Sequence, residues 1–490
     1  MPKRLVNLPW ASLPKGKAGV VALIASVRVV DFYQIASFQT CITLHIQHLQ
    51  PGLSSTDVAR HVGVAQGMFT AAQIVSAPLW GVATDRIGRK AVILVGLVTT
   101  AAACIGVAFA GSIGAIVAWR LFAGALNGTV VAARAAMSDN LALEHRPAGF
   151  SLLVLSFNIA NTIGPLIAAV SIGHSSKGPL TSIPSPASSN KGVMSWAASH
   201  PFATPNLLSA LVLVGDAIMV WYKLKEIDQD KYTDLQKTRY QQISDINVEA
   251  ATSGSEAEKR ARFREPETKL DPSENRLDSI WTPRFIIVLC TVTILEFHLG
   301  AFGSLWPLFV VAARRKTNDP IKLPFLFNGG LELQDADLGF AVGMLGIIGV
   351  ALQLTAVPHL TAKHGVVRAF KASLPLFPAS LFIAPYLALL PAGNGWVLWA
   401  GILFVLLLHV IGRSFGILVS ILLVNQSTTQ SSRRGTVHGI ANAVASTSRS
   451  AGSIAGGMLY GLGLQQNVVG LGWWVTCCVG IIGWILGRWL

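Results

Sequence analysis

The sequence predicts an all-α membrane protein in which twelve transmembrane helices form two pseudo-symmetric six-helix halves. Hydrophobic residues make up 52% of its 490 positions and charged residues only 13%, whereas soluble domains carry about 25% charged residues. So little charge cannot coat the several domains that a soluble chain of this length would form. The apolar residues also lie in blocks of the roughly 20 residues that a helix needs to cross a bilayer.

Twelve apolar blocks are the expected membrane spans. They lie at residues 18–42, 60–82, 91–110, 113–136, 148–171, 204–222, 285–311, 336–357, 369–390, 395–424, 435–463 and 468–488.

The segment between the sixth and seventh spans differs in composition. Residues 223–283 hold 13 of the 24 acidic residues and 11 basic ones, a mixture typical of a solvated, partly disordered linker. The expected organisation is a cytoplasmic N-terminus (1–17), an N-terminal bundle (18–222), this cytoplasmic linker and a C-terminal bundle (284–490).

An internal repeat also indicates two halves. A shift of 288 residues places Gly128 on Gly416 and Gly164 on Gly452. Small residues at matching positions allow helices to pack closely in both halves. Parallel repeats of this kind enclose a central cavity at their interface.

Lys and Arg set the expected orientation. They cluster in the N-terminus, the linker and the turns at 83–90, 358–368 and 426–434, and basic loops favour the cytoplasmic side. The basic segment 314–322 is an exception on the outside. The net charge of +14 forms no basic stripe interleaved with aromatic residues, so a nucleic-acid partner is not expected. We expect a multi-pass protein of the plasma membrane rather than the vacuolar membrane.

The chain lacks the sequence motifs of common enzyme and metal sites. It contains no HExxH motif, Walker loop, GxSxG elbow or Cys/His cluster. His45 and His48 lack a third ligand in the sequence, and an interfacial pair is favoured over a metal site. The expected protein is not an enzyme and needs no cofactor or resident metal.

The turn after the second span carries the most specific motif. Gly81 and Gly88 allow two helices to turn tightly and approach each other. Asp85 can accept hydrogen bonds from free N–H groups at a helix start, or pair with an arginine. The basic residues of the turn, which stay in the cytoplasmic interface, are Arg86, Arg89 and Lys90.

This turn resembles in full the signature loop between helices two and three of the major facilitator superfamily. The resemblance implies twelve helices, alternating access and a loop that holds one state closed. At the matching turn of the second half, Lys363 and Gly365 remain but Ala362 stands where the aspartate would be.

Further motifs resemble those of drug:proton antiporters within this superfamily. The fourth span contains an RxxxGxxxG pattern, and the fifth contains a glycine-proline pair followed by two alanines instead of the usual glycines. These residues are Arg120, Gly124, Gly128, Gly164 and Pro165.

Short pieces at 28–31, 201–206 and 435–439 resemble plant zinc-induced facilitator-like carriers and their fungal relatives. That resemblance implies proton-linked export, or vacuolar loading, of organic molecules or metal chelates.

Acidic residues inside the spans are candidates for proton coupling. Outside the linker 24 − 13 = 11 acids remain. Most of them lie in loops or at span ends, and only Asp31, Asp216 and Glu296 lie in the interior of a span. A charge in hydrocarbon is costly and marks a functional site by default. Asp31 and Glu296 lie near the midplane of the first and seventh spans, which are repeat partners. We therefore expect both to face a shared cavity.

The neighbours of these acids leave alternatives open. Arg28 lies three residues before Asp31 on the same helix face, so the two form either a structural ion pair or a pair switched by protons. Glu296 has no cation on its own helix face, which favours a titrating or substrate-contacting role. Arg120 either faces the cavity as a carboxylate partner or extends to the outer interface.

Amide side chains within the spans could line the cavity or join helices by hydrogen bonds. The candidates are Asn127, Asn158, Asn161 and Gln353.

The sequence thus predicts a monomeric secondary transporter that exports small organic molecules in exchange for protons. Proton symport, uptake and metal-chelate transport remain alternatives within transport. A non-transporting receptor or sensor on the same fold is the alternative from another class.

Overall fold

The computed structural model describes residues 16–142, 145–173, 200–225, 281–315, 321–333, 335–391, 395–427 and 434–487. The described residues of Met1–Leu224 and Pro283–Leu490 form one compact unit. Most of the predicted N-terminus and central linker lies outside the described residues.

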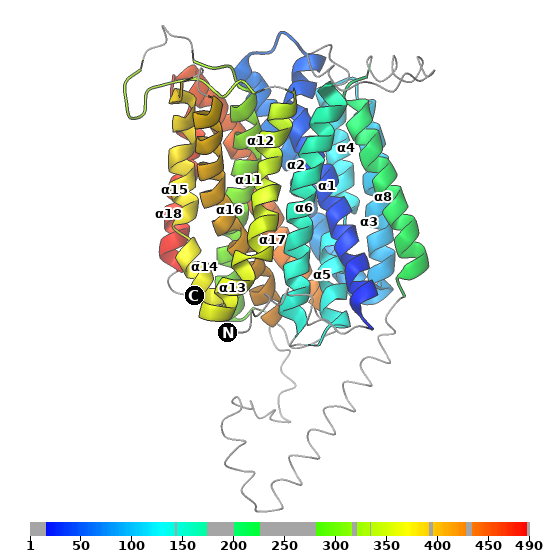
Figure 1. Ribbon diagram of the computed structural model, residues 1–490. Coiled ribbons are helices and arrows are strands. Elements are labelled where there is room, and N and C mark those ends of the chain that lie inside the picture. Colours follow the sequence, from blue (N-terminus) through cyan, green and yellow to red (C-terminus); the bar gives the residue numbers. More distant parts are fainter. Residues whose placement is uncertain are drawn as a thin grey trace, which may run out of the picture. The chain divides into compact units, whose positions relative to one another are not determined.

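Helices occupy the positions of all twelve predicted spans (Figure 1). The first six are α1 (Ala18–Leu49), α2 (Ser55–Ile87), α3 (Arg89–Ala108), α4 (Ile113–Leu126) with α5 (Thr129–Asn140), α6 (Arg146–Gly173) and α8 (Ala203–Lys223). The other six are α11 (Pro283–Val311), α12 (Asp335–Leu354), α14 (Val366–Ser373) with α15 (Leu376–Ile383) and η3 (Ala384–Leu389), α16 (Gly395–Gln426), α17 (Arg434–Gln465) and α18 (Leu471–Gly487). A short helix, α13 (Ala356–His364), precedes α14.

The predicted all-α membrane class is confirmed. Within the described residues, ten helical segments are long and apolar enough to cross a membrane. Of the remaining two spans, α18 is apolar but only 17 residues long. The other, α17, is rich in Ser, Asn and Gly. Because α17 packs against both α2 and α11, protein surrounds much of its polar surface.

Two predicted spans are broken rather than continuous. In the fourth, the side-chain oxygen of Asn127 accepts a hydrogen bond from the backbone N–H of Thr129 at 3.1 Å. This side-chain bond takes the place of a helical backbone bond, and α4 therefore ends before Asn127. The indole nitrogen of Trp80 donates to the carbonyl of Ala125 at 2.9 Å, which satisfies a carbonyl that the break sets free. In the ninth span, the break lies between α14 and α15, where Pro375 directly precedes α15. Proline has no N–H group to donate to the hydrogen bonds of a helix.

Long helix pairs join the first six spans to the last six. The helix α17 packs along α2, and α12 packs along α6 (Figure 1). A Cβ atom added at Gly81 would lie 2.7 Å from the carbonyl oxygen of Gly435, and one added at Gly63 would lie 2.9 Å from that of Ser453. Backbones therefore meet almost directly at both ends of the α2–α17 contact, as small residues permit.

The internal repeat recurs in the packing. Gly164 of α6 lies against α1, where an added Cβ would be 3.0 Å from the carbonyl oxygen of Tyr33. Gly452 of α17 lies in the same way against the carbonyl of Phe297 in α11. Tyr33 and Phe297 are 264 residues apart, so this offset relates the first and seventh spans.

Candidate functional site

The main candidate site is a cavity between the first six and the last six spans. It has an empty volume of about 990 Å³ and is lined by α1, α5, α6, α11, α12, α16 and α17. Its polar lining residues are Arg28, Gln39, Arg134, Asn161, Glu296, His409, Arg413 and Arg449. Three phenylalanines, Phe32, Phe157 and Phe302, add aromatic surface.

Glu296 forms an ion pair across two helices. The Nε and Nη2 atoms of Arg449 on α17 donate to Oε2 of Glu296 on α11, at 2.9 and 2.6 Å. The Glu296 side chain is 8% exposed and that of Arg449 is 28% exposed. The pair therefore lies in the cavity wall, with its arginine accessible to a bound molecule.

Asp31, which the sequence places at a shared cavity with Glu296, is not among the residues that line this one. With the offset of 264 residues, Glu296 corresponds to Phe32, which also lines the cavity. Asp31 corresponds to Leu295, whose side chain packs against Gly416. One residue turns the side chain by about 100° around a helix, so Asp31 is not among the lining residues.

Asp31 instead contacts the break in the fourth span. Asn127 donates to its Oδ1 at 2.8 Å and Thr129 to its Oδ2 at 2.8 Å, while Arg28 forms an ion pair with Oδ2. Asn127 also donates to Thr100 of α3 at 3.2 Å. Asp31 and Asn127 together thus link the first, third and fourth spans. Of the Arg28–Asp31 ion pair, only Arg28 lines the cavity.

Arg120 has an amide rather than a carboxylate as its hydrogen-bond partner. Its Nη1 donates to the side-chain oxygen of Gln34 at 3.2 Å, not to a carboxylate. The guanidinium lies over the rings of Phe38 and Phe69, 4.3 and 4.4 Å from their centroids. Arg120 is buried within the protein rather than extended to an interface, and it lines a smaller cavity that also contains Arg449.

The four amide candidates divide between the two expected roles. Asn161 lines the main cavity. The others connect helices: Asn127 binds Asp31, Asn158 accepts from Arg413 at 3.0 Å, and Gln353 donates to Ser151 at 2.6 Å. Gln353 therefore joins α12 to α6.

The Asp85 turn contacts the start of α17. Both carboxylate oxygens of Asp85 accept hydrogen bonds, from the backbone N–H of Gly435 at 3.1 Å and from the N–H and hydroxyl of Thr436 at 2.9 and 3.1 Å. A carboxylate at a helix start satisfies free N–H groups and complements the helix dipole. The second and eleventh spans are thereby fastened together at the predicted cytoplasmic end.

Two basic residues of the turn form hydrogen bonds to other helices of the first six spans. Arg89 donates to Asp139 of α5 at 3.0 Å, and Lys90 donates to the carbonyl of Trp221 of α8 at 2.8 Å. Arg86 is exposed. Gly88 has φ = +95°, a conformation that favours glycine.

The two glycines of the RxxxGxxxG motif lie at close contacts between helices. A Cβ at Gly124 would collide with the carbonyl oxygen of Phe69 on α2, and one at Gly128 would lie 3.0 Å from the Trp80 ring. Pro165 lies inside α6, and its carbonyl oxygen is 3.0 Å from where a Cβ of Gly339 would be.

Several residues that line the cavity are not among the candidates predicted from the sequence. The arginines Arg134, Arg413 and Arg449 lie in predicted spans, where charge signals function, but they are not among the candidates named from the sequence. His409 is likewise absent from the sequence candidates, although its ring stacks on Phe302 at 3.7 Å between centroids. A polar side chain near the middle of the tenth span was the available signal.

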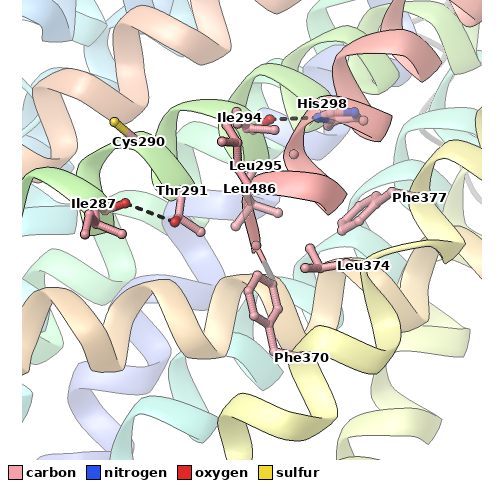
Figure 2. Close-up of a pocket in the computed structure, with 13 residues that line it drawn as sticks. Ile287, Cys290, Thr291, Ile294, Leu295, His298, Phe370, Leu374, Phe377 and Leu486 are labelled. Carbon is pink, nitrogen blue, oxygen red and sulfur yellow. Dashed lines mark hydrogen bonds between the residues drawn. The ribbon is translucent and has the colours of Figure 1, made fainter. Parts of the chain in front are cut away.

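A second cavity of about 960 Å³ lies between α11, α14, α15 and α18. Figure 2 shows that its polar side chains bond within their own helix: Thr291 donates to the Ile287 carbonyl, and His298 pairs with that of Ile294 at 2.7 Å. No charged side chain lines it among the described residues. The charged cavity is therefore the stronger candidate for a transport site.

Comparisons with known proteins agree with this architecture. The family model described as Major Facilitator Superfamily matches residues 28–317. The major facilitator superfamily multidrug transporter mfsB of Aspergillus fumigatus is 25% identical, over 98% of this chain and 84% of its own length. Efflux pump azaK of Aspergillus niger is 29% identical over 33% of this chain and 35% of its own.

Among solved structures, the human organic anion transporter MFSD10 (TETRAN) superposes with a TM-score of 0.62 and 16% identity. The match covers 97% of this chain and all of the other. At that identity the likeness shows the fold.

Proposed function

This chain belongs to the Major Facilitator Superfamily and is a multi-pass membrane transporter, not an enzyme, and from that premise we propose that it exports small organic molecules in exchange for protons. The observation that carries the proposal is the cavity of about 990 Å³ with the Glu296–Arg449 ion pair in its wall. The cavity provides space for a small molecule, and the pair provides a carboxylate that a proton can neutralise.

The position of this pair connects proton binding to helix movement. Arg449 lies on α17, the helix that packs along α2 and whose start is held by Asp85. Neutralising Glu296 removes its ionic attraction to Arg449 and so weakens the hold of α11 on α17. A ligand shifts a conformational equilibrium only by binding its states differently. A proton on Glu296 meets that condition if the ion pair persists in one state alone.

Alternating access then follows from rocking of residues 18–222 against residues 284–490. The near-contact of backbones along α2 and α17, with small residues such as Gly63 and Gly81, supports two bundles that move as bodies. The Asp85 turn would stabilise the state closed at the predicted cytoplasmic end.

We place the protein in the plasma membrane, since export from the cell requires that location. A functional monomer is proposed because one chain provides the whole cavity lining. The multidrug and efflux relatives support export over uptake.

Purified protein in proteoliposomes with an acidic lumen tests the exchange. A substrate added outside should release protons from the lumen, measured by a pH-sensitive dye. Ethidium, tetracycline and 2-naphthoate represent cationic, zwitterionic and anionic solutes. Glu296→Gln should abolish the proton release while solute-for-solute exchange continues. Proton release that is unchanged in this variant would sink the assignment of Glu296.

A further inference from the structure

The cavity wall carries more positive than negative charge. Among the described residues, four arginines and one glutamate line it. Arg28 pairs with Asp31 and Arg449 pairs with Glu296. The other two arginines, Arg134 and Arg413, have no carboxylate partner in the described part of the chain.

Arg413 is held in place by neutral groups. Its Nη2 donates to the side-chain oxygen of Asn158 at 3.0 Å and to the carbonyl of Leu345 at 2.9 Å. Its guanidinium lies 5.0 Å from the centroid of Phe157. Its buried Nε has no acceptor in the described structure. These contacts orient the guanidinium without compensating its charge, and a buried uncompensated charge is costly.

Arg134 has still fewer contacts. No hydrogen bond or ion pair is found for it among the described residues. It interacts electrostatically with Arg28, Glu296 and Arg449. With Asp31 paired to Arg28, three cations and two anions lie around this part of the cavity, which leaves a net positive charge. An entering anion would be attracted, whereas an entering cation would be repelled.

Apolar surface lies beside these cations. Phe32 and Phe157 meet edge to face at 4.7 Å, and Phe302 stacks on His409. A planar guanidinium binds a carboxylate or sulfonate through two parallel hydrogen bonds. The wall thus combines anion-binding groups with a surface for aromatic or aliphatic bodies.

We propose that the cavity binds organic anions, with Arg134 and Arg413 contacting the acidic group and the phenylalanines contacting the apolar body. This inference rests on the proposed transport function and names its substrate class. Organic cations are disfavoured by the same charges.

Calorimetric binding to the purified full-length protein tests it. The probes are two matched pairs, 2-naphthoate with 2-naphthamide and pyrene-1-carboxylate with pyrene-1-carboxamide, which differ within each pair mainly in charge. We expect at least one carboxylate to bind ten-fold or more tightly than its amide. Arg134→Gln and Arg413→Gln should each raise the Kd of that carboxylate at least ten-fold and leave the Kd of the amide unchanged.

The control variants separate charge from folding. Arg134→Lys and Arg413→Lys keep the charge and should retain part of the preference for the carboxylate. Arg60→Gln, at an exposed position of α2, should retain all of it. Equal binding of both members in both pairs, no detectable binding of either carboxylate, or full preference in both Gln variants would overturn the proposal.

Failure of this inference is distinguishable from failure of the proposed function. Proton release driven by ethidium or tetracycline, without a preference for carboxylates in binding, would contradict only the substrate class. Tight carboxylate binding without proton release would contradict only the proton exchange.

Discussion

Asp85 and Thr436 lie 351 positions apart in the chain and share two hydrogen bonds, from the Thr436 backbone N–H and hydroxyl to the same carboxylate oxygen. The contact joins the end of α2 to the start of α17. No equivalent aspartate exists in the other half, where Ala362 occupies the matching position.

Asp85→Ala should destabilise the state that this contact fastens. Removing a helix-cap acceptor typically costs about 0.5–2 kcal/mol, which is enough to shift a conformational equilibrium several-fold. Spin labels can be attached at Gly19→Cys and Lys363→Cys after the exposed cysteines are removed by Cys290→Ser and Cys478→Ser. In the Asp85→Ala variant, a greater share of the distances between the two labels should be long. An unchanged distance distribution would contradict a locking role, and Arg86→Ala serves as a control within the same turn.

Glu296→Gln should make substrate movement independent of the pH gradient, because a neutral amide cannot alternate between the ionised and neutral states. Transport rates across a series of lumenal pH values would measure this. Asp216→Asn is a matched control. Asp216 is also an acid within a span, but it accepts from Ser26 at 2.9 Å and does not line the cavity. Loss of pH dependence in both variants would point to a general defect.

Asp31→Ala should mainly reduce stability. It leaves Arg28 buried without its anion, and breaking one partner of a buried ion pair costs about 3–5 kcal/mol. Thermal melting in detergent should show a large decrease. Asp31→Asn retains hydrogen-bonding capacity and should lose less. If Asp31→Ala folded with normal stability but lost proton coupling, a direct coupling role would replace the structural one.

Gly452→Ala should loosen the contact between α17 and α11, because the new Cβ would collide with the carbonyl oxygen of Phe297. Overpacking of this kind costs about 1–3 kcal/mol. The matched substitution Gly215→Ala meets nothing within 4 Å and should be neutral in the same melting assay. Equal melting temperatures for the two variants would contradict the close approach of α17 to α11.

The fold was accessible from sequence because length and apolarity mark a membrane span without reference to the rest of the chain. The span 204–222, for example, corresponds to α8 (Ala203–Lys223) within one residue at each end. The break at Asn127 was missed because both flanks are apolar and the side-chain bonds that end α4 involve Asp31, 96 residues away.

The site was less accessible for a geometric reason. Asp31 and Glu296 both lie near the middle of repeat-partner spans, but the offset that relates these spans is 264 residues rather than the 265 that separates the two acids. Sequence alone does not determine helix rotation to one residue. The partner of Glu296 was missed for a similar reason, since Arg449 lies 153 positions further along the chain.

The different settings of the two acids have a consequence for chemical labelling. A small hydrophobic carbodiimide reacts with carboxyl groups that it can reach from within the bilayer or from an internal chamber. Glu296 presents its carboxyl at the chamber wall, whereas Asp31 is enclosed by Arg28, Asn127 and Thr129. Such a reagent should therefore modify Glu296 in preference to Asp31, and bound substrate should protect Glu296 from modification.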